Sequence, residues 1–446
     1  MDDNGTSQSS YPNQEAEPGP NPSFDLVRDF FRATPDYDVV MRPELPSAPL
    51  LTQQIQEETS THVISIRPIR QLHCMQVVRE CMASSAAFLA LSLFALRLCC
   101  CHEQDADDGN GVTAIYSLGD SITDTGNLVK EASPGMFETI KHLLPSTGRY
   151  SDGLLMIDFL AQDLGLPFLN RYLGKNKSFD HGVNFAVAGA TATDPAVQFS
   201  RGFPMPFAAN SLKLQLRWFK DFMKSSFGTD EEIRRRLQNS LVLIGEIAGN
   251  DYNYAFFGNK AVNEVEKLIP EVVRTIIDAA KEVLDMGANG VIVPGNFPIG
   301  CVPGYLTMRA GSSEPSDYDS MGCVRELNLF AAMHNSRPSY PDASIAYADY
   351  FNSFLALLSN ASSLGFDAAS TRKACCGAGG GGEYNFDWRR MCGAGGATAC
   401  AEPSAYVSWD GIHMTQAAYR AMSRLIYRGK YLEPQILNFQ ERNGQA

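Results

Sequence analysis

Five short apolar segments alternate with longer amphipathic ones between residues 113 and 432, and this alternation restricts the fold more than any other feature of the sequence. Gly, Pro, Asn or Asp bounds each apolar segment, as is typical of strands. The segments between them repeat apolar residues with the 3.6-residue period of a helix. Such alternation predicts an α/β protein, in which helices cover both faces of a parallel sheet. We expect one domain with strands at Thr113–Leu118, Val183–Val187, Ser240–Ile244, Gly290–Pro294 and Ala343–Ala348, and helices at Leu154–Leu164, Leu212–Phe222, Glu231–Asn239, Val262–Met286, Asp319–His334 and Thr415–Tyr427.

The first expected strand ends abruptly within the sequence AIYSLGDSITDTGN, which contains Ser121. In a parallel α/β sheet, functional groups gather at the carboxyl ends of the strands, and Ser121 lies just beyond such an end. Ser121 and Asp124 also have the spacing of a capping box, in which a hydroxyl accepts a hydrogen bond from a free backbone N–H at the start of a helix. This segment alone therefore leaves two interpretations open: a catalytic nucleophile or a helix cap.

A serine nucleophile needs a base, and His413 is the best candidate among the seven histidines. It lies in WDGIHMTQ, three residues after Asp410, a spacing that can bring both side chains to one side of a turn. Asp410 could then accept a hydrogen bond from one ring nitrogen while the other nitrogen faces Ser121. The same pair could instead bind a metal ion, or could be an aspartate at a helix start beside an incidental histidine. The remaining histidines have no such arrangement: His62, His73, His102, His142, His181 and His334.

Two further residues follow expected strands and could bind a developing negative charge. Asn250, in GEIAGNDY, can present an amide donor at the edge of the sheet where Ser121 lies. Gly189 follows the second expected strand, where a residue without a side chain can expose its backbone N–H. Each has a simpler interpretation, because Gly-Asn-Asp also forms turns and a glycine also permits a tight bend.

Charge and glycine patterns argue against several other functional classes. The net charge of −13 argues against binding to nucleic acid, which requires a basic face. The glycine-rich stretch 377–382 neither follows a strand nor ends in Gly-Lys-Ser/Thr, so it lacks the features of a phosphate-binding loop. No G-x-G-x-x-G follows the first expected strand, which removes the simplest dinucleotide interpretation. We therefore expect no nucleic-acid partner, no cofactor and no metal requirement.

Four sequence blocks occur in the order that is typical of the GDSL family of SGNH-type serine hydrolases. They are Gly119-Asp-Ser121, Gly189 within NFAVAGATA, Gly249-Asn250-Asp251 and Asp410-Gly-Ile-His413. From about residue 113 to about residue 432, the chain resembles the plant GDSL esterase/lipases most. The stretches GRYSDG, PGNFPIGCVP, YADYF and CCGAGG are similar to plant members as well.

The resemblance implies a three-layer, flavodoxin-like α/β/α sandwich of the SGNH hydrolase type with a five-stranded parallel sheet. It also implies that Ser121 is the nucleophile, His413 the base and Asp410 the residue that orients the histidine. The oxyanion donors would be the N–H groups of Ser121 and Gly189 and the side-chain amide of Asn250. The implied activity is hydrolysis of a carboxylic ester, with a small-molecule or lipid-like ester as substrate.

Three segments depart from the family pattern. Plant members have His-Pro-Thr-Glu where this chain has His413-Met-Thr-Gln, and a second glycine where it has Ala248. Neither change removes a donor, base or nucleophile. Pro338 is expected to end the helix before the last strand early, near residues 335–341, and so to expose apolar sheet surface. This shortening raises the alternative of a catalytically impaired binding protein; a second alternative is an acyltransferase or glycan-acting variant of the same site.

The eleven cysteines fall into two groups. Five cluster around one apolar run between residues 74 and 101, and six lie between residues 301 and 400. An even six suits up to three disulfides in an oxidising compartment. A zinc site is the alternative, but no C-x2-C pair is present among the six. We predict a bridge between Cys301 and Cys323 after the fourth strand, and further pairs among Cys375, Cys376, Cys392 and Cys400.

Residues 82–106 resemble a secretory signal peptide, although they do not lie at the start of the sequence. The apolar run Ala86–Leu96 has the length of a signal-peptide core. The fourteen uncharged residues 83–96 are fewer than the roughly twenty that span a membrane. A buried membrane anchor is the alternative, but we expect secretion and no stable membrane span.

The segment before the apolar run lacks sustained periodicity and is rich in Pro, Gly, Ser, Gln and acidic residues. We expect residues 1–81 to be a disordered or non-native N-terminal extension, with the natural start at Met75 or Met82. Residues 107–446 are then the hydrolase domain. The glycosylation sequons at Asn176 and Asn360 suit a secreted glycoprotein.

Overall fold

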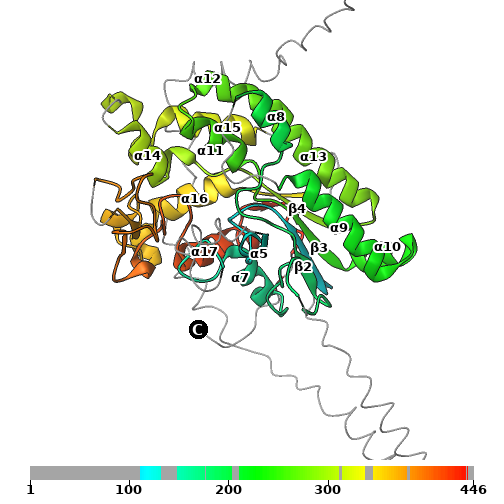
Figure 1. The fold of residues 1–446 in the computed structure, drawn as a ribbon. Helices are drawn as coiled ribbons and strands as arrows, with labels where there is room; N and C mark the ends of the chain where they lie inside the picture. The colour runs from blue at the N-terminus through cyan, green and yellow to red at the C-terminus, as the bar shows by residue number, and fades with distance from the viewer. Residues whose placement is uncertain are drawn as a thin grey trace, which may run out of the picture.

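A central six-stranded sheet with helices against both faces organises the chain (Figure 1). The computed structural model describes residues 111–131, 148–175, 177–202, 210–310, 314–336, 345–378, 382–437 and 439. The strand order is β2-β1-β3-β4-β5-β8, and only the edge strand β8 is antiparallel to its neighbour. The strands are β1 Ala114–Leu118, β2 Gly182–Asn184, β3 Ser240–Ile244, β4 Gly290–Pro294, β5 Ile345–Ala348 and β8 Leu432–Glu433. The predicted α/β sandwich around five parallel strands is confirmed.

The inner strands are buried on both faces, which explains their continuous apolar sequences. Every residue of β1 (AIYSL) and β3 (SLVLI) is buried. Parallel sheets covered by helices on both faces select such runs rather than an alternating pattern. The register pairs Ala114 with Ser240 and Leu118 with Ile244, so both strands end at the same level. The loops that follow them therefore begin side by side at the carboxyl edge of the sheet.

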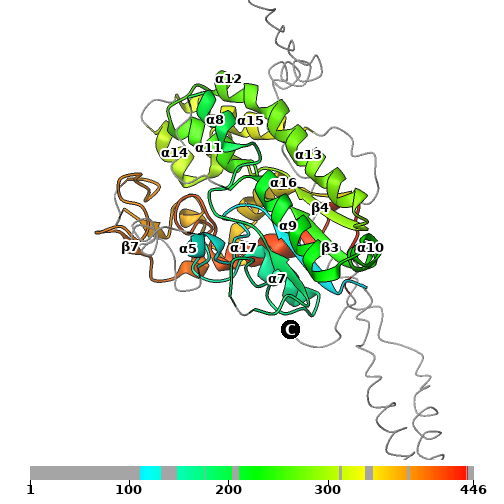
Figure 2. The same ribbon diagram turned by 45° about the vertical axis from the view of Figure 1, so that its right-hand side comes forward.

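The helices form two layers (Figures 1 and 2). Helices α9, α10, α13 and α15 cover one face of the sheet, and α7, α16 and α17 pack on the other. Aromatic side chains fill the first interface: the Tyr116 and Phe219 rings meet edge to face at 5.6 Å. The helices are α5 Asn127–Glu131, α7 Met156–Asp163, α8 Pro195–Ser200, α9 Leu212–Phe227, α10 Asp230–Gln238, α11 Gly249–Phe257, α12 Val262–Val265, α13 Ile269–Asp285, α14 Pro303–Arg309, α15 Arg325–Asn335, α16 Tyr350–Ser359 and α17 Gln416–Ser423.

Local capping residues determine where several of these helices begin. The Ser211 side chain accepts the N–H of Leu214 at the start of α9. At the start of α10, Thr229 and Glu232 form a reciprocal capping box. Such caps typically contribute about 1 kcal/mol each, because they satisfy amides that the first turn leaves without an intrahelical partner. The two helices begin within one residue of their predicted starts, because the capping residues directly precede them in the sequence.

Two predicted helices differ from the observed ones for identifiable reasons. The expected helix Val262–Met286 is divided into α12, a 3-10 turn at Glu266–Leu268, and α13. Pro270 lies in the first turn of α13, where its missing N–H is tolerated. The helix expected from Asp319 begins only at Arg325, because the Asp319 carboxylate accepts the N–H groups of Met321 and Cys323 and stabilises a loop instead.

Helix α9 continues to Phe227, beyond its expected end at Phe222, and α17 ends at Ser423, where a π-helical turn at Arg424–Arg428 follows. Other differences concern short or unpredicted elements. β2 ends at Asn184 rather than Val187, although the Val187 N–H still donates to the Gly119 carbonyl beyond β1. The two-residue strand β8 was not expected, since so short a segment carries no periodicity. Helix α11 was expected only as a turn.

The predicted shortening near residues 335–341 falls largely outside the described residues. Helix α15 ends at Asn335, ahead of Pro338, and residues 337–344 are not described. All four residues of β5, the next strand, are buried. The expected exposure of apolar sheet surface is therefore not seen in this strand.

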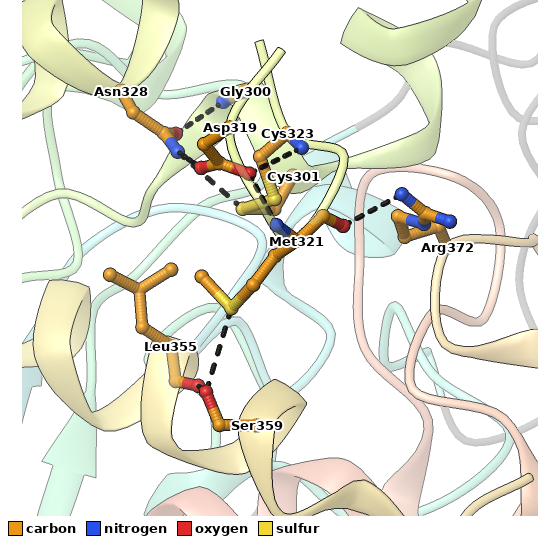
Figure 3. Close-up of a disulfide and its surroundings, with 9 residues drawn as sticks. All are labelled: Gly300, Cys301, Asp319, Met321, Cys323, Asn328, Leu355, Ser359 and Arg372. Atoms are coloured by element: carbon orange, nitrogen blue, oxygen red, sulfur yellow. Dashed lines mark hydrogen bonds between the residues drawn. A yellow bond between two sulfur atoms is a disulfide. The ribbon is translucent and has the colours of Figure 1, made fainter. Parts of the chain in front are cut away.

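Three disulfides join the six cysteines of the C-terminal half, as predicted. Cys301 bonds to Cys323, which ties the loop after β4 to the start of α15 (Figure 3). Beside this bridge, the Asn328 side chain accepts the N–H of Gly300 at 2.9 Å. A loop of this size, with a sequence separation of 22, typically gains about 3 kcal/mol from the crosslink. The other two bridges are Cys375–Cys400 and Cys376–Cys392.

Residues 1–110 lie outside the described part of the chain. They include the expected N-terminal extension and the signal-peptide-like segment, so both stay predictions. Asn176 of the first sequon is likewise outside the described residues. Among the residues that are described, no helix is long and apolar enough to cross a membrane.

Candidate active site

The loops that leave β1, β2 and β3 meet a C-terminal loop at the carboxyl edge of the sheet. Ser121 is the third residue after β1. The turn that carries it is held to the loop after β3, because the Asp120 N–H donates to the Glu246 carbonyl at 2.9 Å. The sheet register thus brings these segments together without any direct sequence proximity.

Ser121, His413 and Asp410 form a continuous chain of hydrogen bonds. His413 Nε2 lies 2.8 Å from Ser121 Oγ, and His413 Nδ1 lies 2.6 Å from Asp410 Oδ2. All three side chains are buried. The structure therefore brings together the hydroxyl, imidazole and carboxylate that the sequence singled out.

The loop that carries Asp410 and His413 folds back on its own aspartate. Asp410 Oδ1 accepts the N–H groups of Ile412 at 2.9 Å and His413 at 2.7 Å. Gly411 has φ +93°, a left-handed conformation that favours glycine, and a Cβ there would lie 2.2 Å from the Phe386 ring. This tight turn is the reason why a three-residue spacing places both side chains on one side.

Two disulfides support this loop from outside the central sheet. The Cys375 N–H donates to the Ser408 carbonyl at 3.0 Å, and the Cys376 N–H donates to the Trp409 carbonyl at 2.6 Å. Each of these adjacent cysteines is bonded to a later one, Cys400 and Cys392 respectively. The small sheet of β6 (Cys376–Gly377) and β7 (Thr398–Ala399) lies in the same segment.

The surroundings of Asp410 keep it ionised. Burial raises the pKa of this carboxyl, but the charge of His413 and hydrogen bonds from His413 and Ile412 outweigh burial and hold the pKa below its usual range. An ionised Asp410 accepts the proton on Nδ1, which leaves Nε2 as an acceptor for the Ser121 hydroxyl. The Tyr150 ring lies 4.7 Å from the imidazole and packs against it, which restricts its rotation.

Asn250 and Gly189 lie in the loops next to Ser121. Asn250 occupies the first turn of α11, and its Nδ2 donates to the Ala190 carbonyl at 2.9 Å and to Asp120 Oδ2 at 3.2 Å. Gly189 has φ +82°, and the Tyr254 hydroxyl holds its carbonyl at 2.8 Å. No described residue accepts a hydrogen bond from the N–H of Gly189 or of Ser121. Within the described part of the chain, the backbone amides of Ser121 and Gly189 thus lack an acceptor, and the Asn250 amide lies in the loop beside them.

The helix-cap interpretation applies to Asp124 rather than to Ser121. Asp124 Oδ1 accepts the N–H groups of Gly126 and Asn127, and Oδ2 accepts those of Leu128 and Ala188. The first amides of α5 are therefore satisfied by the aspartate three residues after the serine. The Ser121 hydroxyl faces His413 instead.

Sequence reasoning gave no separate role to three buried acidic residues of the site. Asp251 accepts hydrogen bonds from the N–H groups of Ala192 and Thr193, and from the Thr193 hydroxyl, so it fixes the segment after Gly189. The other two are Asp120 and Glu246, which lie 3% and 4% exposed. The available signal was adjacency, since Asp120 directly precedes Ser121 and Asp251 directly follows Asn250.

A small apolar pocket of about 30 Å³ lies beside His413. Its walls include Ile122, Val302, Phe354 and Met414. Cys301 also lines it, and this cysteine is bonded to Cys323 (Figure 3). A cavity of this volume admits only a group of about the size of one or two water molecules, such as a methyl group, next to the imidazole.

The geometry does not favour a metal site at Asp410 and His413. Both imidazole nitrogens already face protein atoms, one the carboxylate and the other the serine hydroxyl. Across the described ranges, no group of three or more His, Cys, Asp or Glu side chains is arranged to hold a metal ion. The pair instead has the arrangement of an acid and a base that serve a hydroxyl.

Comparison with known proteins agrees with this geometry. The profile of the GDSL-like lipase/acylhydrolase family matches residues 115–426. A GDSL esterase/lipase of Arabidopsis thaliana is 43% identical over 341 residues, which cover 72% of this chain and 83% of the relative. Acetylajmalan esterase 2 of Rauvolfia serpentina is 41% identical over 342 residues, which cover 73% of this chain and 90% of the relative. The chain belongs to the GDSL-like lipase/acylhydrolase family and is a carboxylic ester hydrolase of the GDSL esterase/lipase type.

Proposed function

We propose that the protein is a secreted serine hydrolase that cleaves acyl esters with Ser121 as nucleophile, His413 as base and Asp410 as the residue that orients the histidine. The observation that carries the proposal is the chain of hydrogen bonds from carboxylate to imidazole to hydroxyl, at 2.6 and 2.8 Å. A serine hydroxyl becomes a useful nucleophile only when a neighbouring base takes its proton, and this geometry provides that base.

In the first half of the reaction, Ser121 Oγ attacks the ester carbonyl and His413 Nε2 takes the hydroxyl proton. Asp410 stabilises the imidazolium that forms. The tetrahedral intermediate collapses when His413 returns the proton to the alkoxide oxygen of the leaving alcohol. The acyl group is then bonded to Ser121.

In the second half, water attacks the acyl-serine and His413 again acts as base and then as acid. The carboxylic acid leaves and the serine is regenerated. In both halves the carbonyl oxygen carries a negative charge in the tetrahedral intermediate. We propose that the N–H groups of Ser121 and Gly189 and the side-chain amide of Asn250 donate hydrogen bonds to this oxygen. Neither backbone amide has an acceptor among the described residues, which supports this assignment.

We propose an ester with a short acyl group as the substrate. The names of the Rauvolfia relatives describe them as acetylajmalan esterases, which act on an acetyl ester. The apolar pocket beside His413 supports a substrate with a small apolar part. Secretion is supported by the three disulfides, since such bridges persist in oxidising compartments.

The test is covalent labelling by an organophosphonate, combined with turnover of p-nitrophenyl acetate and butyrate. The protein would be expressed from Met82 in a secreting eukaryotic host. We expect label on Ser121 alone, release of acetate, and loss of both signals in Ser121→Ala. Turnover that survives in a folded Ser121→Ala protein would contradict the proposal. A folded wild type that neither labels nor turns over would favour the binding-protein alternative, and acylated product formed with an added alcohol would favour acyl transfer.

A further inference from the structure

Asp120 is a buried carboxyl group that the proposed triad does not use. It directly precedes Ser121, and its side chain is almost completely enclosed. Its Oδ1 accepts the N–H of Ile122 at 3.0 Å, and its Oδ2 accepts a hydrogen of Asn250 Nδ2 at 3.2 Å. The carboxyl group is thus fixed by the loop after β1. It also contacts the side-chain amide of Asn250, which we propose as a hydrogen-bond donor to the oxyanion.

The Asn250 amide group has two hydrogens, and each of them faces an acceptor. The Ala190 carbonyl accepts one at 2.9 Å, and Asp120 Oδ2 accepts the other at 3.2 Å. The amide oxygen also accepts a longer hydrogen bond from Asn253 Nδ2 at 3.4 Å, so Asp120 is one of three partners that orient the amide plane. The hydrogen that faces Asp120 is in the longer bond, so it is the one that an oxyanion on the substrate can share.

The charge around Asp120 suits this position. A fully ionised carboxylate would oppose an oxyanion next to it, but burial raises the pKa of Asp120 to about 7, even though the Ile122 N–H and His413 lower it. Asp251 and Asp124 raise it further. Burial, and next to it the charge of Asp120, also raise the pKa of Glu246 well above its ordinary value. Burial therefore weakens the tendency of both carboxyl groups to ionise near the position that we propose for the oxyanion.

We propose that Asp120 is a positioning residue of the oxyanion hole, whose Oδ2 atom holds the Asn250 amide in the orientation that binds the oxyanion. This inference rests on the proposed role of Asn250. It assigns to the aspartate of the Gly-Asp-Ser sequence a function in catalysis that acts through another side chain. It also predicts that Asp120 contributes to kcat only while Asn250 is present.

The isosteric change Asp120→Asn tests the inference. The Ile122 N–H and Asn250 Nδ2 donate to different carboxylate oxygens, and asparagine has an NH₂ group at one of these two positions, so one of the two donors loses its acceptor. We would measure kcat and KM with p-nitrophenyl acetate for wild type, Asp120→Asn, Asn250→Ala and the double variant, with thermal unfolding by circular dichroism for each. Asp349→Asn is the matched control, because Asp349 caps α16 through the N–H of Asn352 and asparagine caps equally well.

We expect Asp120→Asn to lower kcat by about 10- to 100-fold, because a misaligned donor loses part of its effect. KM should stay within about threefold of wild type, since the neutral ester needs this donor less. The double variant should be no slower than Asn250→Ala, and the control should retain wild-type kcat. If Asp120→Asn does not fold, Asp120→Glu is the second variant: it keeps both oxygens but displaces them by one methylene group, and the same pattern is expected.

Two results would overturn the inference. The first requires that Asn250→Ala alone is slow. It is either a double variant in which the two losses of kcat multiply, or a folded Asp120 variant that keeps wild-type kcat. That result leaves the proposed oxyanion hole intact and removes only the role of Asp120. The other is wild-type kcat in Asn250→Ala, which removes the proposed role of Asn250 and the inference together.

Discussion

The two halves of the candidate site rest on different kinds of structure. Ser121, Gly189 and Asn250 lie in loops that leave parallel strands of the central sheet, and a buried register holds those strands in place. Asp410 and His413 lie in a loop outside that sheet, which hydrogen-bonds to the segment of Cys375 and Cys376. The first half is positioned by packing, and the second by covalent crosslinks and backbone hydrogen bonds.

This difference teaches that the nucleophile and the base can be perturbed separately. Sheet packing is cooperative and does not depend on redox conditions, whereas a loop held by disulfides does. Changes in the nucleophile half should therefore alter chemistry without altering the base loop. Changes in the crosslinks should loosen the base while the nucleophile stays in place.

The largest effect is expected in the nucleophile half. Ser121→Ala should lower kcat by about 10⁶-fold, because no other hydroxyl can form the acyl intermediate. The fold should be unaffected, since Asp124 rather than Ser121 caps α5. Ester turnover and thermal unfolding check this, and a large drop in melting temperature would mean that Ser121 has a structural role.

The next effect is expected in the base half. Asp410→Asn should lower kcat by about 10⁴-fold, because the amide favours the wrong imidazole tautomer and gives less support to the imidazolium. The amide oxygen can still accept the Ile412 and His413 N–H groups, so the loop should keep its shape. Steady-state kinetics and phosphonate labelling measure the loss. A decrease of less than about tenfold would show that Asp410 has only a structural role.

Removal of a disulfide should distinguish the two supports. The double change of Cys376 and Cys392 to alanine should cost about 2–5 kcal/mol of unfolding free energy and lower kcat by about tenfold, because the loop that carries His413 loses its restraint. The double change of Cys301 and Cys323 should have a similar effect on stability but a smaller effect on kcat. Unfolding curves and kinetics below the transition measure both. Equal losses of kcat would mean that the two halves are not separately supported.

The smallest effect is expected at a helix start far from both halves. Thr229→Ala removes the α10 capping box and should cost about 1 kcal/mol, with kcat unchanged. Chemical denaturation and kinetics check this. A drop in kcat would show that general loss of stability, rather than local support, explains the disulfide result.

The sequence predicted the parts of the site that depend on local or periodic signals. Continuous apolar runs placed β1, β3 and β4 within a residue, because strands buried on both faces are made of such runs. The spacing of Asp410 and His413 was informative because a single tight turn joins them. The residues that we propose for the oxyanion hole were chosen from strand ends and from the family resemblance.

Features that depend on tertiary contacts were beyond reach of the sequence. The contact of Asp120 with Asn250 joins residues that are 130 positions apart, and neither residue has a periodic signal for it. Helix α15 begins later than predicted because the Asp319 carboxylate accepts hydrogen bonds from the N–H groups of Met321 and Cys323, which stabilises a loop in place of a first helical turn. The sequence did not show which of Cys392 and Cys400 pairs with Cys375 and which with Cys376. The two adjacent cysteines differ by only one residue in their separation from each candidate, so loop length does not distinguish the pairings.

The order of the site along the chain has a consequence for its synthesis. Ser121 and the base that would activate it are separated by 292 residues. At about 5–20 residues per second, a ribosome needs roughly 15–60 s to translate that interval. A nascent chain therefore carries its serine long before His413 exists, and Cys392 and Cys400 also emerge late. On the proposed mechanism, hydrolytic activity begins only after translation is nearly complete, and it reaches its full level once the last cysteines have been oxidised.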